Sequence, residues 1–466
     1  MHNLLTASCF HLLSDNADAF IARASLIQGA QQSLDIQYYA IHNDASGHYL
    51  NHMILEAADR GVKVRILVDD LNLSGRDREL KLFNLHPNIS IKIFNPLTNR
   101  EWFRYLELVI YQGKADRRMH NKAFIVDNQI AIIGGRNIGD EYFDNRNSVN
   151  FVDLDLLTQG PLVNDISQSF ECYWNSSWAV AISDLSVIRV ARKQLITIKQ
   201  RLRDSWHRAR NSPYFGKIQH RSFAHSLQQG EIPFIHAPAQ LFYDHPEKIT
   251  QLDENSSDQL GLHIRPIVEN AQFEVVIASP YFIPGDDGVA QFKQLTDREV
   301  SVKILTNSLS TTDVIAVHAG YRRYRPTLLN AGVELYELKS TAHSHFDRAR
   351  SLLKGLQSTS LHAKYLVIDQ RWVYTGSANL DPRSRRLNTE IGVMIDSPEL
   401  AAAVLNLFTQ SIRSENSYRL SFQQGSLRWQ TKEGRREIQY NNEPKSSFWK
   451  RLLVRLIGLL PAENLL

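Results

Sequence analysis

Hydrophobic positions along the chain alternate between two spacings, and the alternation occurs in both halves. Short apolar runs typical of buried strands cover residues 34–39 and 62–68 in the first half and 273–279 and 300–305 in the second. Apolar residues at helical spacing lie between these runs. Strands that alternate with helices predict parallel βαβ units, so we expect each half to form an α/β/α lobe.

The second half repeats the polar residues of the first as well as its apolar pattern. Residues 119–127, MHNKAFIVD, have their counterpart in residues 361–369, LHAKYLVID. After six further residues each half has a glycine turn that ends in asparagine, at residues 134–137 and 376–379. Internal repetition is usually architectural, and architecture requires only the apolar positions to repeat. The repeated polar residues therefore indicate a chemical role.

Length and composition agree with a folded protein of two lobes. A chain of 466 residues is long for one core, and its 43% apolar and 22% charged fractions are those of globular proteins. We expect the two lobes to be related by pseudo-twofold symmetry, with an active site at their interface. The predicted parts are a first lobe, a basic linker, a second lobe and a tail, at residues 1–188, 189–235, 236–415 and 416–466.

The charge and the cysteine content of the chain limit which binding partners and structural features it can have. The net charge of +4 and the pI near 8.8 suit an anionic partner such as phospholipid or nucleic acid. Cys9 and Cys172 are the only cysteines, which excludes a disulfide framework and a thiolate metal cluster. No run of about 18 to 20 apolar residues predicts a membrane-spanning helix. A leader or lipid anchor preceding this sequence stays an open alternative.

The repeated motif places an imidazole beside an ammonium group in each half. On a strand, residues two apart point to the same face, so we expect His120 beside Lys122 and His362 beside Lys364. If the two halves meet, two imidazoles and two ammonium groups surround one site. Such a site suits a phosphodiester, because one neutral histidine attacks phosphorus while the other, protonated, donates to the departing oxygen. Histidine titrates near neutral pH, which permits both roles.

The glycine turns supply further candidate substrate contacts. Asn137 and Asn379 return an amide to the histidine face, and Gly135 and Ser377 belong to the same turns. Together with the two lysines, these groups offset the negative charge of a phosphoryl transition state, so we expect no metal ion and no cofactor. His343 and His345 lack a third ligand in the sequence, so we do not interpret them as a metal site.

Acidic residues accompany both motifs. Asp127 and Asp369 belong to the motif and count among its candidate catalytic residues, although we favour a structural role as hydrogen-bond acceptors. Asp153 and Glu390 are better candidates for the carboxylate that accepts an imidazole N–H and fixes the tautomer. The pair Asp69-Asp70 ends a predicted strand, where we expect it to cap the following helix; a substrate-side role is the alternative, because ligands in such sheets bind at the carboxyl ends of strands.

The duplicated His-Lys-Asp signature resembles that of the phospholipase D superfamily. Matches at residues 34–39, 67–70, 118–122, 134–143 and 454–456 are similar to bacterial cardiolipin synthases of the C type. The resemblance implies a phosphatidyltransferase that makes cardiolipin through a phosphohistidine, with phosphatidylglycerol as acceptor and phosphatidylethanolamine or a second phosphatidylglycerol as donor. It also implies that His120 is the nucleophile, which the spacing does not decide.

Other functions remain open at this point. A phospholipase D hydrolase would use the same residues and let water resolve the intermediate. A nuclease of the same superfamily would need a basic groove with aromatic stacking surfaces. A non-catalytic membrane-binding scaffold is the alternative from a different class. Our reading is a monomeric enzyme, peripheral to a bacterial membrane, with phospholipid substrates and no nucleic acid partner.

Two segments outside the motifs bear on membrane contact. Residues 189–221 are rich in Lys and Arg, which predicts a basic helix followed by a loop, either solvated or facing anionic headgroups. Residues 448–460 are apolar at helical spacing, with Arg451 and Arg455 one turn apart. This helix fits equally well packed on a lobe or lying in a membrane interface.

Overall fold

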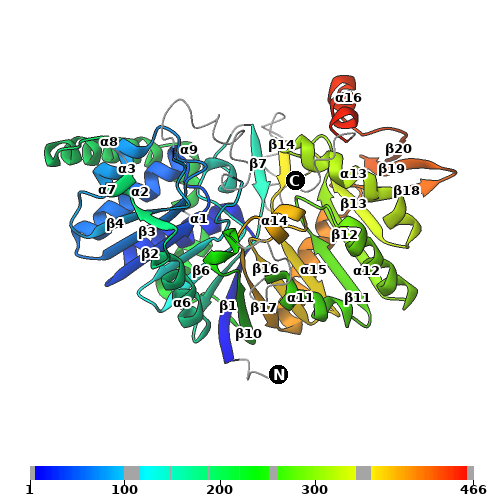
Figure 1. The fold of residues 1–466 in the computed structure, drawn as a ribbon, viewed down its shortest axis with the longest axis horizontal. Coiled ribbons are helices and arrows are strands. Elements are labelled where there is room, and N and C mark those ends of the chain that lie inside the picture. The colour runs from blue at the N-terminus through cyan, green and yellow to red at the C-terminus, as the bar shows by residue number, and fades with distance from the viewer. Residues whose placement is uncertain are drawn as a thin grey trace. The chain divides into compact units, whose positions relative to one another are not determined.

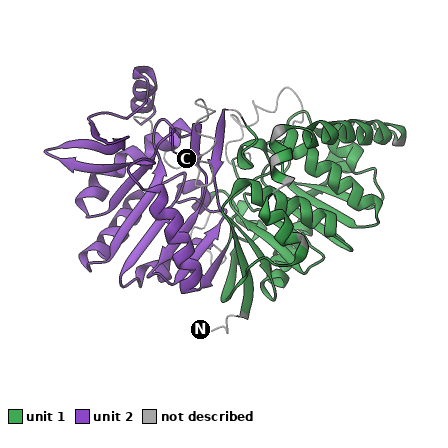
Figure 2. Cartoon of the chain, turned by 180° about the vertical axis from the view of Figure 1, so that it is seen from behind, with its two compact units in different colours: residues 1–146, 155–259, 387–392 green, residues 147–154, 260–386, 393–466 purple. Residues whose placement is uncertain are grey.

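The computed structural model describes residues 6–98, 116–146, 148–185, 188–219, 221–250, 260–342 and 358–458. The chain divides into two compact units, each of which takes a short segment from the other half of the sequence (Figure 2). Unit 1 consists of residues 1–146, 155–259 and 387–392. Unit 2 consists of residues 147–154, 260–386 and 393–466.

Unit 1 is built on a mixed sheet. Strands β2, β3 and β4 run parallel, and β5, β6, β8, β1 and β10 continue the sheet from β2 in antiparallel steps, while β9 pairs with β4 (Figure 1). The bounds are β1 (Thr6–Leu13), β2 (Ser33–Tyr38), β3 (Lys63–Asp69), β4 (Ile89–Phe94), β5 (Ala123–Val126), β6 (Ile130–Gly134), β8 (Asp155–Gln159), β9 (Ala179–Ala181) and β10 (Ile235–Tyr243).

Helices cover both faces of this sheet. Arg23 of α1 donates to the Tyr38 hydroxyl, whereas Arg65 binds Asp35 and Glu171 of α6. Even and odd positions of a strand face opposite sides, so α1 and α6 lie on opposite faces. The helices of unit 1 are α1 (Asn16–Gly29), α2 (Ala45–Asp59), α3 (Asp77–Phe83), η1 (Asp140–Tyr142), α6 (Leu162–Trp174), α7 (Ile182–Leu185), α8 (Arg192–Arg210), α9 (Pro213–Gln219), α10 (Ser222–Gln229) and η2 (Pro246–Ile249).

Unit 2 repeats the central part of that sheet. Strands β11, β12 and β13 are parallel, β15 and β16 extend the sheet antiparallel from β11, and β18, β19 and β20 extend it from β13. A separate parallel pair joins β7 to β14. The bounds are β7 (Val149–Val152), β11 (Glu274–Ala278), β12 (Ser301–Asn307), β13 (Glu334–Leu338), β14 (Ser358–Leu361), β15 (Tyr365–Ile368), β16 (Trp372–Gly376), β17 (Ile391–Asp396), β18 (Ser417–Gln423), β19 (Ser426–Glu433) and β20 (Arg436–Tyr440).

The helices of unit 2 pack mainly on these strands. Helix α12 contacts β12, α13 contacts β13 and β18, and α15 contacts β15 and β16. Short polar side chains start several helices of both units; Asp44, Ser397 and Ser447 accept hydrogen bonds from the first turns of α2, α15 and α16. The bounds are α11 (Leu260–Glu269), α12 (Gly285–Asp297), α13 (Ile315–Asn330), α14 (Pro382–Arg386), α15 (Pro398–Ser411) and α16 (Phe448–Ile457).

The two sheets confirm the predicted duplication. β2 to β4 correspond to β11 to β13, and the hairpin β5–β6 corresponds to β15–β16. Both hairpins pair with the first parallel strand of their unit, with Leu34 opposite Val126 and Val275 opposite Ile368. Repeated α/β architecture is therefore present in both units. No helix within the described residues is long and apolar enough to cross a membrane.

The basic linker departs from the expected helix and loop. A basic helix, α8, is present at residues 192–210, but α9 and α10 follow it where we expected a loop. Aromatic contacts explain this difference. Phe215 of α9 stacks on Tyr49 of α2 at 4.7 Å and lies edge-on to Phe20 of α1, and Trp206 of α8 packs against His52. The linker is thus part of unit 1.

Candidate active site

The two His-Lys pairs do not lie on regular strands, which corrects the sequence-based expectation. His120 and Lys122 precede β5, and His362 and Lys364 occupy the three-residue link between β14 and β15. Each segment arrives at the carboxyl edge of the parallel strands, because Ala123 pairs with Gln37 near the end of β2 and Tyr365 pairs with Ala278 at the end of β11. Ligands of open α/β sheets bind at this edge.

In unit 1, His120 lies buried against the segment around Glu390. The Nδ1 atom of His120 is 2.9 Å from Oε2 of Glu390, and its backbone N–H donates to the Thr389 carbonyl at 2.9 Å. Glu390 is fixed in turn, because its backbone N–H donates to the Asp244 carboxylate at 2.9 Å. A proton on Nδ1 therefore faces a carboxylate, which assigns the lone pair to Nε2.

In unit 2, His362 repeats this arrangement with the segment around Asp153. Its Nδ1 atom is 2.6 Å from Oδ2 of Asp153, and its backbone N–H donates to the Val152 carbonyl at 2.8 Å. The other oxygen of Asp153 accepts the backbone N–H of Leu154 at 2.7 Å. Both histidines thus have the geometry of an imidazole whose tautomer is set by a carboxylate.

Each carboxylate comes from the half of the sequence that does not contain its histidine. Glu390 follows His120 by 270 residues, and Asp153 precedes His362 by 209 residues. These are the two segments that the units exchange. Spacing along the chain identified both acids as candidates, but it carried no information about which histidine each one contacts.

The lysines are buried next to the histidines. Nζ of Lys364 lies 2.8 Å from Nδ1 and 3.2 Å from Nε2 of His362, so the expected neighbouring cation is present in unit 2. In unit 1, Nζ of Lys122 donates to the carbonyl of His120 and lies 5.4 Å from the centre of the Tyr39 ring. Both lysines are only 2% exposed. Buried ammonium groups in such positions favour an anionic ligand.

Asp69 and Asn307 hold the histidine segments, a role that the sequence analysis missed. Asp69 ends β3 and accepts the backbone N–H of Met119 at 2.9 Å. Asn307 ends β12 and both donates to and accepts from the backbone of Leu361 at 2.9 Å. Asp69 is fully buried, and burial raises the pKa of its carboxyl group. Alignment of the two halves would have revealed the pair, since both residues end the second parallel strand.

The expectation that Asp69-Asp70 caps a helix is wrong. Asp69 bonds to Leu71 and Met119, and Asp70 accepts the backbone N–H of Leu97 at 2.8 Å. The next helix begins only at Asp77. These carboxylates instead connect loops at the carboxyl edge of the sheet, because three chain segments meet there.

Asp127 and Asp369 lie in the hairpin turns at the opposite ends of β5 and β15. Asp127 accepts the backbone N–H groups of Gln31, Gln32 and Ser33 at 2.7–2.9 Å. Asp369 accepts those of residues 272–274 at 2.7–3.1 Å. Both have φ of 52° and are followed by a second residue with positive φ, as in the two-residue turns that suit hairpins. Both carboxylates therefore join a hairpin turn to the chain segment before the first parallel strand.

The two asparagines of the glycine turns have buried amide oxygens without a protein partner. Oδ1 of Asn137 and Oδ1 of Asn379 both lack a hydrogen bond, although the residues are 3% and 9% exposed. Nδ2 of Asn137 donates to the Tyr142 hydroxyl at 2.8 Å. Amide oxygen and nitrogen are interchangeable assignments, so either orientation leaves one buried polar atom for a ligand. Ser377 is fully buried in the same turn as Asn379.

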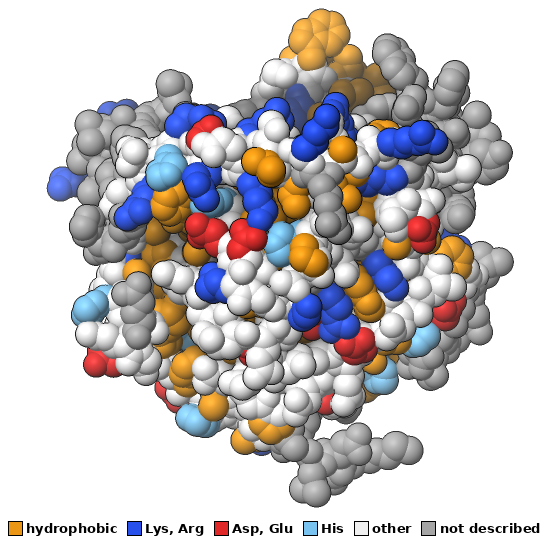
Figure 3. Space-filling model, turned by 90° about the vertical axis from the view of Figure 1, so that its left-hand side faces the viewer, with side chains coloured by type: hydrophobic (Ala, Val, Ile, Leu, Met, Phe, Trp, Pro, Cys, Tyr) orange, Lys and Arg blue, Asp and Glu red, His pale blue; other side chains and the backbone are white. Residues whose placement is uncertain are grey.

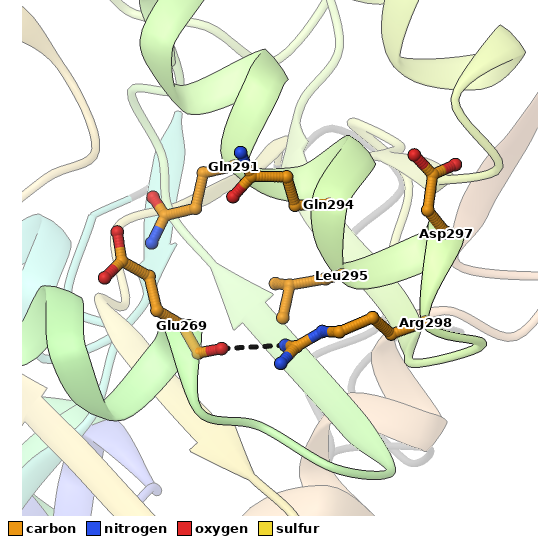
Figure 4. A pocket seen from close by; sticks show the side chains of 6 residues that line it. All are labelled: Glu269, Gln291, Gln294, Leu295, Asp297 and Arg298. Atoms are coloured by element: carbon orange, nitrogen blue, oxygen red, sulfur yellow. Dashed lines mark hydrogen bonds between the residues drawn. The ribbon is translucent and has the colours of Figure 1, made fainter.

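Two other features involve different residues. A pocket of about 370 Å³ in unit 2 is lined by residues of α11 and α12 that precede β11 and β12, which places it at the amino edge of the sheet (Figure 4). His42, Asp44 and Glu141 bring possible metal ligands within 4.8 Å of one another. His42 already pairs with Glu141 at 3.1 Å, and Arg146 lies 3.5 Å from Glu141, so we assign no metal there. His343 and His345 lie outside the described residues.

The chain is similar to known proteins. The family model described as "Cardiolipin synthase, PLD-like domain" matches residues 24–174 and 264–412. Cardiolipin synthase C of Escherichia coli is 39% identical over 456 residues, which cover 97% of this chain and 95% of that protein. An uncharacterized protein of Helicobacter pylori is 36% identical over 460 residues, which cover 97% of this chain and 89% of that protein.

A solved structure supports the fold. The phosphatidylserine synthase of Haemophilus influenzae superposes with a TM-score of 0.63 at 14% identity, covering 100% of this chain and 98% of that one. Fold and repeated motif together define a protein of the phospholipase D-like class. Within that class, the chain belongs to the cardiolipin synthase family.

Proposed function

We propose that the chain is a phosphatidyltransferase that makes cardiolipin by transphosphatidylation. The observation that carries the proposal is the matched pair of imidazole–carboxylate contacts, His120 with Glu390 and His362 with Asp153. One histidine alone supplies either a nucleophile or an acid. Two equivalent ones, acting on the same phosphorus atom, supply both for a phosphoryl transfer that needs no metal.

In the first step, His120 acts as the nucleophile. Its Nε2 lone pair forms a bond to phosphorus of the donor lipid while the bond from phosphorus to the headgroup oxygen breaks. His362, protonated, gives its proton to that oxygen, which leaves as the free alcohol. The product is a phosphatidyl-histidine, and Glu390 stabilises the positive charge that develops on the His120 ring.

In the second step, the glycerol headgroup of phosphatidylglycerol displaces His120 from phosphorus. His362, now neutral, takes the proton of the glycerol hydroxyl, whose oxygen attacks phosphorus as the bond to Nε2 breaks. Cardiolipin is released, and both histidines return to their starting protonation states. The donor is phosphatidylethanolamine or a second phosphatidylglycerol, so that ethanolamine or glycerol is the alcohol lost in the first step.

The remaining motif residues bind and position the substrate in this proposal. Lys122 and Lys364 offset the charge of the nonbridging oxygens, and the asparagines, with Gly135 and Ser377 of the same turns, donate to them. The buried amide atoms without partners in Asn137 and Asn379 support that assignment. Asp127 and Asp369 act through the hairpins that they fix, as positioning residues.

We also propose that the enzyme works as a monomer on the surface of a bacterial membrane, peripherally attached. Its substrates are phospholipids, and the exposed side of α8 offers Lys193, Arg201, Arg203, Arg208 and Arg210 to anionic headgroups. Figure 3 shows Lys and Arg side chains gathered across the upper part of that side of unit 1. Each cation near an anionic surface contributes on the order of 1 kcal/mol.

A product assay tests the proposal. Vesicles of phosphatidylglycerol with labelled phosphatidylethanolamine, incubated with the pure protein, should yield labelled cardiolipin and free ethanolamine, and neither should appear with His120→Ala. Phosphatidic acid as the sole product would show that the protein is a hydrolase and not a transferase. Cleavage of DNA without lipid turnover would show that the protein is a nuclease.

A further inference from the structure

Helix α16 has one face packed on unit 2 and one face in solvent. Val454 is buried against Leu309 and Ala319, with Ile457 at the edge of the same cluster. The opposite face carries four large apolar side chains, which are exposed to 44–73% of their surface: Phe448, Trp449, Leu453 and Leu456. The helix therefore presents an apolar surface that its own unit does not cover, next to α13 at the margin of unit 2 (Figure 1).

This concentration of exposed apolar side chains is local. Within the described residues, ten large hydrophobic side chains are exposed, and four of them belong to this helix of ten residues. Residues 449, 453 and 456 are one turn apart and line one side of the helix. Scattered exposed hydrophobics are ordinary in soluble proteins, but a contiguous group marks an interaction surface.

The charges of α16 indicate the kind of partner. Lys450, Arg451 and Arg455 lie on the helix, and residues 444–458 include no Asp or Glu. Arg455 is exposed beside the apolar face, while Arg451 donates to the carbonyl of Ser446 at 2.6 Å and stays near the helix start. Aromatic and leucine side chains that share a helix with cations and no acids fit an anionic bilayer, where the apolar groups enter the acyl region and the cations meet phosphates.

We propose that α16 lies in the surface of an anionic lipid bilayer, with Trp449, Leu453 and Leu456 inserted below the headgroups. The proposal rests on the proposed function, because it identifies the element that holds a lipid-transferring enzyme at its substrate. Ser447 caps the helix and Val454 fixes it to unit 2, so the membrane-facing side is formed before binding. A preformed helix binds without the entropic cost of folding at the surface.

The test compares two variants of the full chain. One combines Trp449→Ser, Leu453→Ser and Leu456→Ser; the control is Phe273→Ser, which removes a side chain of unit 2 that is as exposed as Trp449, at 73%. Sedimentation with vesicles of phosphatidylglycerol and phosphatidylethanolamine should show binding weakened at least about tenfold in the triple variant and unchanged in the control. Vesicles of phosphatidylcholine alone should bind the wild type more weakly.

Further measurements separate this inference from the proposed function and from a folding defect. Thermal unfolding of the triple variant should match the wild type, and cardiolipin formation in detergent micelles, where no bilayer is needed, should stay within about twofold. In wild type, brominated acyl chains should quench a fluorescence component that Trp449→Ser removes. Equal vesicle binding by the triple variant, or no such component, would overturn the role of α16 even if cardiolipin is made. If the wild type were a dimer and the triple variant a monomer, the exposed face of α16 would bind a second copy of the chain and not a bilayer.

Discussion

At the scale of single residues, each of the two proposed catalytic histidines is oriented by a carboxylate on Nδ1. Buried imidazoles of this kind keep one tautomer and one ring orientation, which a nucleophile needs in order to present Nε2. Glu390 and Asp153 are themselves held by backbone contacts, to Asp244 and Leu154. The chemistry of both histidines therefore depends on residues that do not touch the substrate.

Removal of the charge from Glu390 should impair catalysis more than binding. We expect Glu390→Gln to lower kcat about 10- to 100-fold with KM changed little, because His120 loses the carboxylate that orients it. Glu399→Gln, at an exposed position on α15, should leave both constants unchanged. Steady-state kinetics on mixed micelles measures the difference.

NMR can detect directly the pairing of each histidine with a carboxylate from the other half of the sequence. In nitrogen-15 spectra of labelled histidines, Glu390→Gln should perturb the Nδ1 signal of His120, and Asp153→Asn that of His362. Assignment comes from His120→Asn and His362→Asn. If Asp153→Asn moved the His120 signal instead, each carboxylate would belong to its own half, contrary to the contacts described above.

Asp127 should contribute to stability and not to chemistry. Its carboxylate accepts three backbone N–H groups, so we expect Asp127→Asn to lower the free energy of unfolding by about 1–2 kcal/mol. Asparagine tolerates the positive φ of 52° at this position, which isolates the loss of charge. Asp184→Asn, at an exposed site, should change stability by less than about 0.5 kcal/mol. Denaturant titration and measurement of kcat together distinguish a structural from a catalytic role. A large loss of kcat with no loss of stability would give Asp127 a catalytic role.

Residue types were predictable from the sequence, whereas their partners were not. Two copies of one motif identified the histidines, lysines and asparagines, because unrelated segments do not repeat polar residues at fixed spacing. The contacts of Asp153 and Glu390 depend on how distant strands are arranged, which periodicity does not encode. Asp69 was assigned to the wrong structure because its partner, Met119, is 50 residues away.

At the scale of elements, the two hairpins β5–β6 and β15–β16 deliver each His-Lys segment to the sheet edge. The apolar pattern of residues 123–126 and 365–368 correctly indicates strands. The preceding histidines are excluded from those strands because their backbone N–H groups bond to Thr389 and Val152, which belong to the exchanged segments. Local pattern thus predicted the strand and misplaced its start.

The contact between His42 after β2 and Glu141 of η1 should make stability depend on pH. The hydrogen bond to Glu141 raises the pKa of His42 above its ordinary value. Burial acts to raise the pKa of Glu141, but the hydrogen bond and the charge of His42 outweigh burial, so the pKa of Glu141 is lowered. The contribution of the pair is therefore complete between about pH 4.5 and 6.5, and it is lost as pH rises through the raised pKa of His42.

A variant measures this contribution. Glu141→Gln should lower the Tm more at pH 5.5 than at pH 8.5, since only at the lower pH does wild type have both charges. The contact of Arg146 with Glu141 leaves a smaller loss at the higher pH. Equal losses at both values would mean that His42 does not gain a proton from the pairing.

At the scale of the whole molecule, each unit is completed by a segment from the other half of the chain. Residues 387–392 join unit 1, where Thr389 and Glu390 make backbone hydrogen bonds to Arg118, His120 and Asp244. The lobe boundaries expected from sequence follow the order of the chain, and order alone does not reveal such an exchange.

A fragment of residues 1–259 should therefore be less stable than unit 1 in the full chain. It lacks five hydrogen bonds that involve the backbone of Thr389 and Glu390, worth roughly 2.5–7.5 kcal/mol at about 0.5–1.5 kcal/mol each. Calorimetry should show a lower transition temperature for the fragment, and the full chain is the control. Identical transitions would mean that the exchanged segment adds nothing to unit 1.

The central claim, covalent transfer through His120 with His362 as acid and base, is tested most directly by trapping the intermediate. A phosphatidyl ester of p-nitrophenol needs no acid to release its alcohol, so His362→Ala should react once and accumulate a phosphatidyl adduct on the peptide that contains His120. Mass spectrometry of acid-free digests should find that adduct, and find none with His120→Ala. An adduct on His362, or cardiolipin formation by the wild type with no adduct on either histidine, would contradict the account.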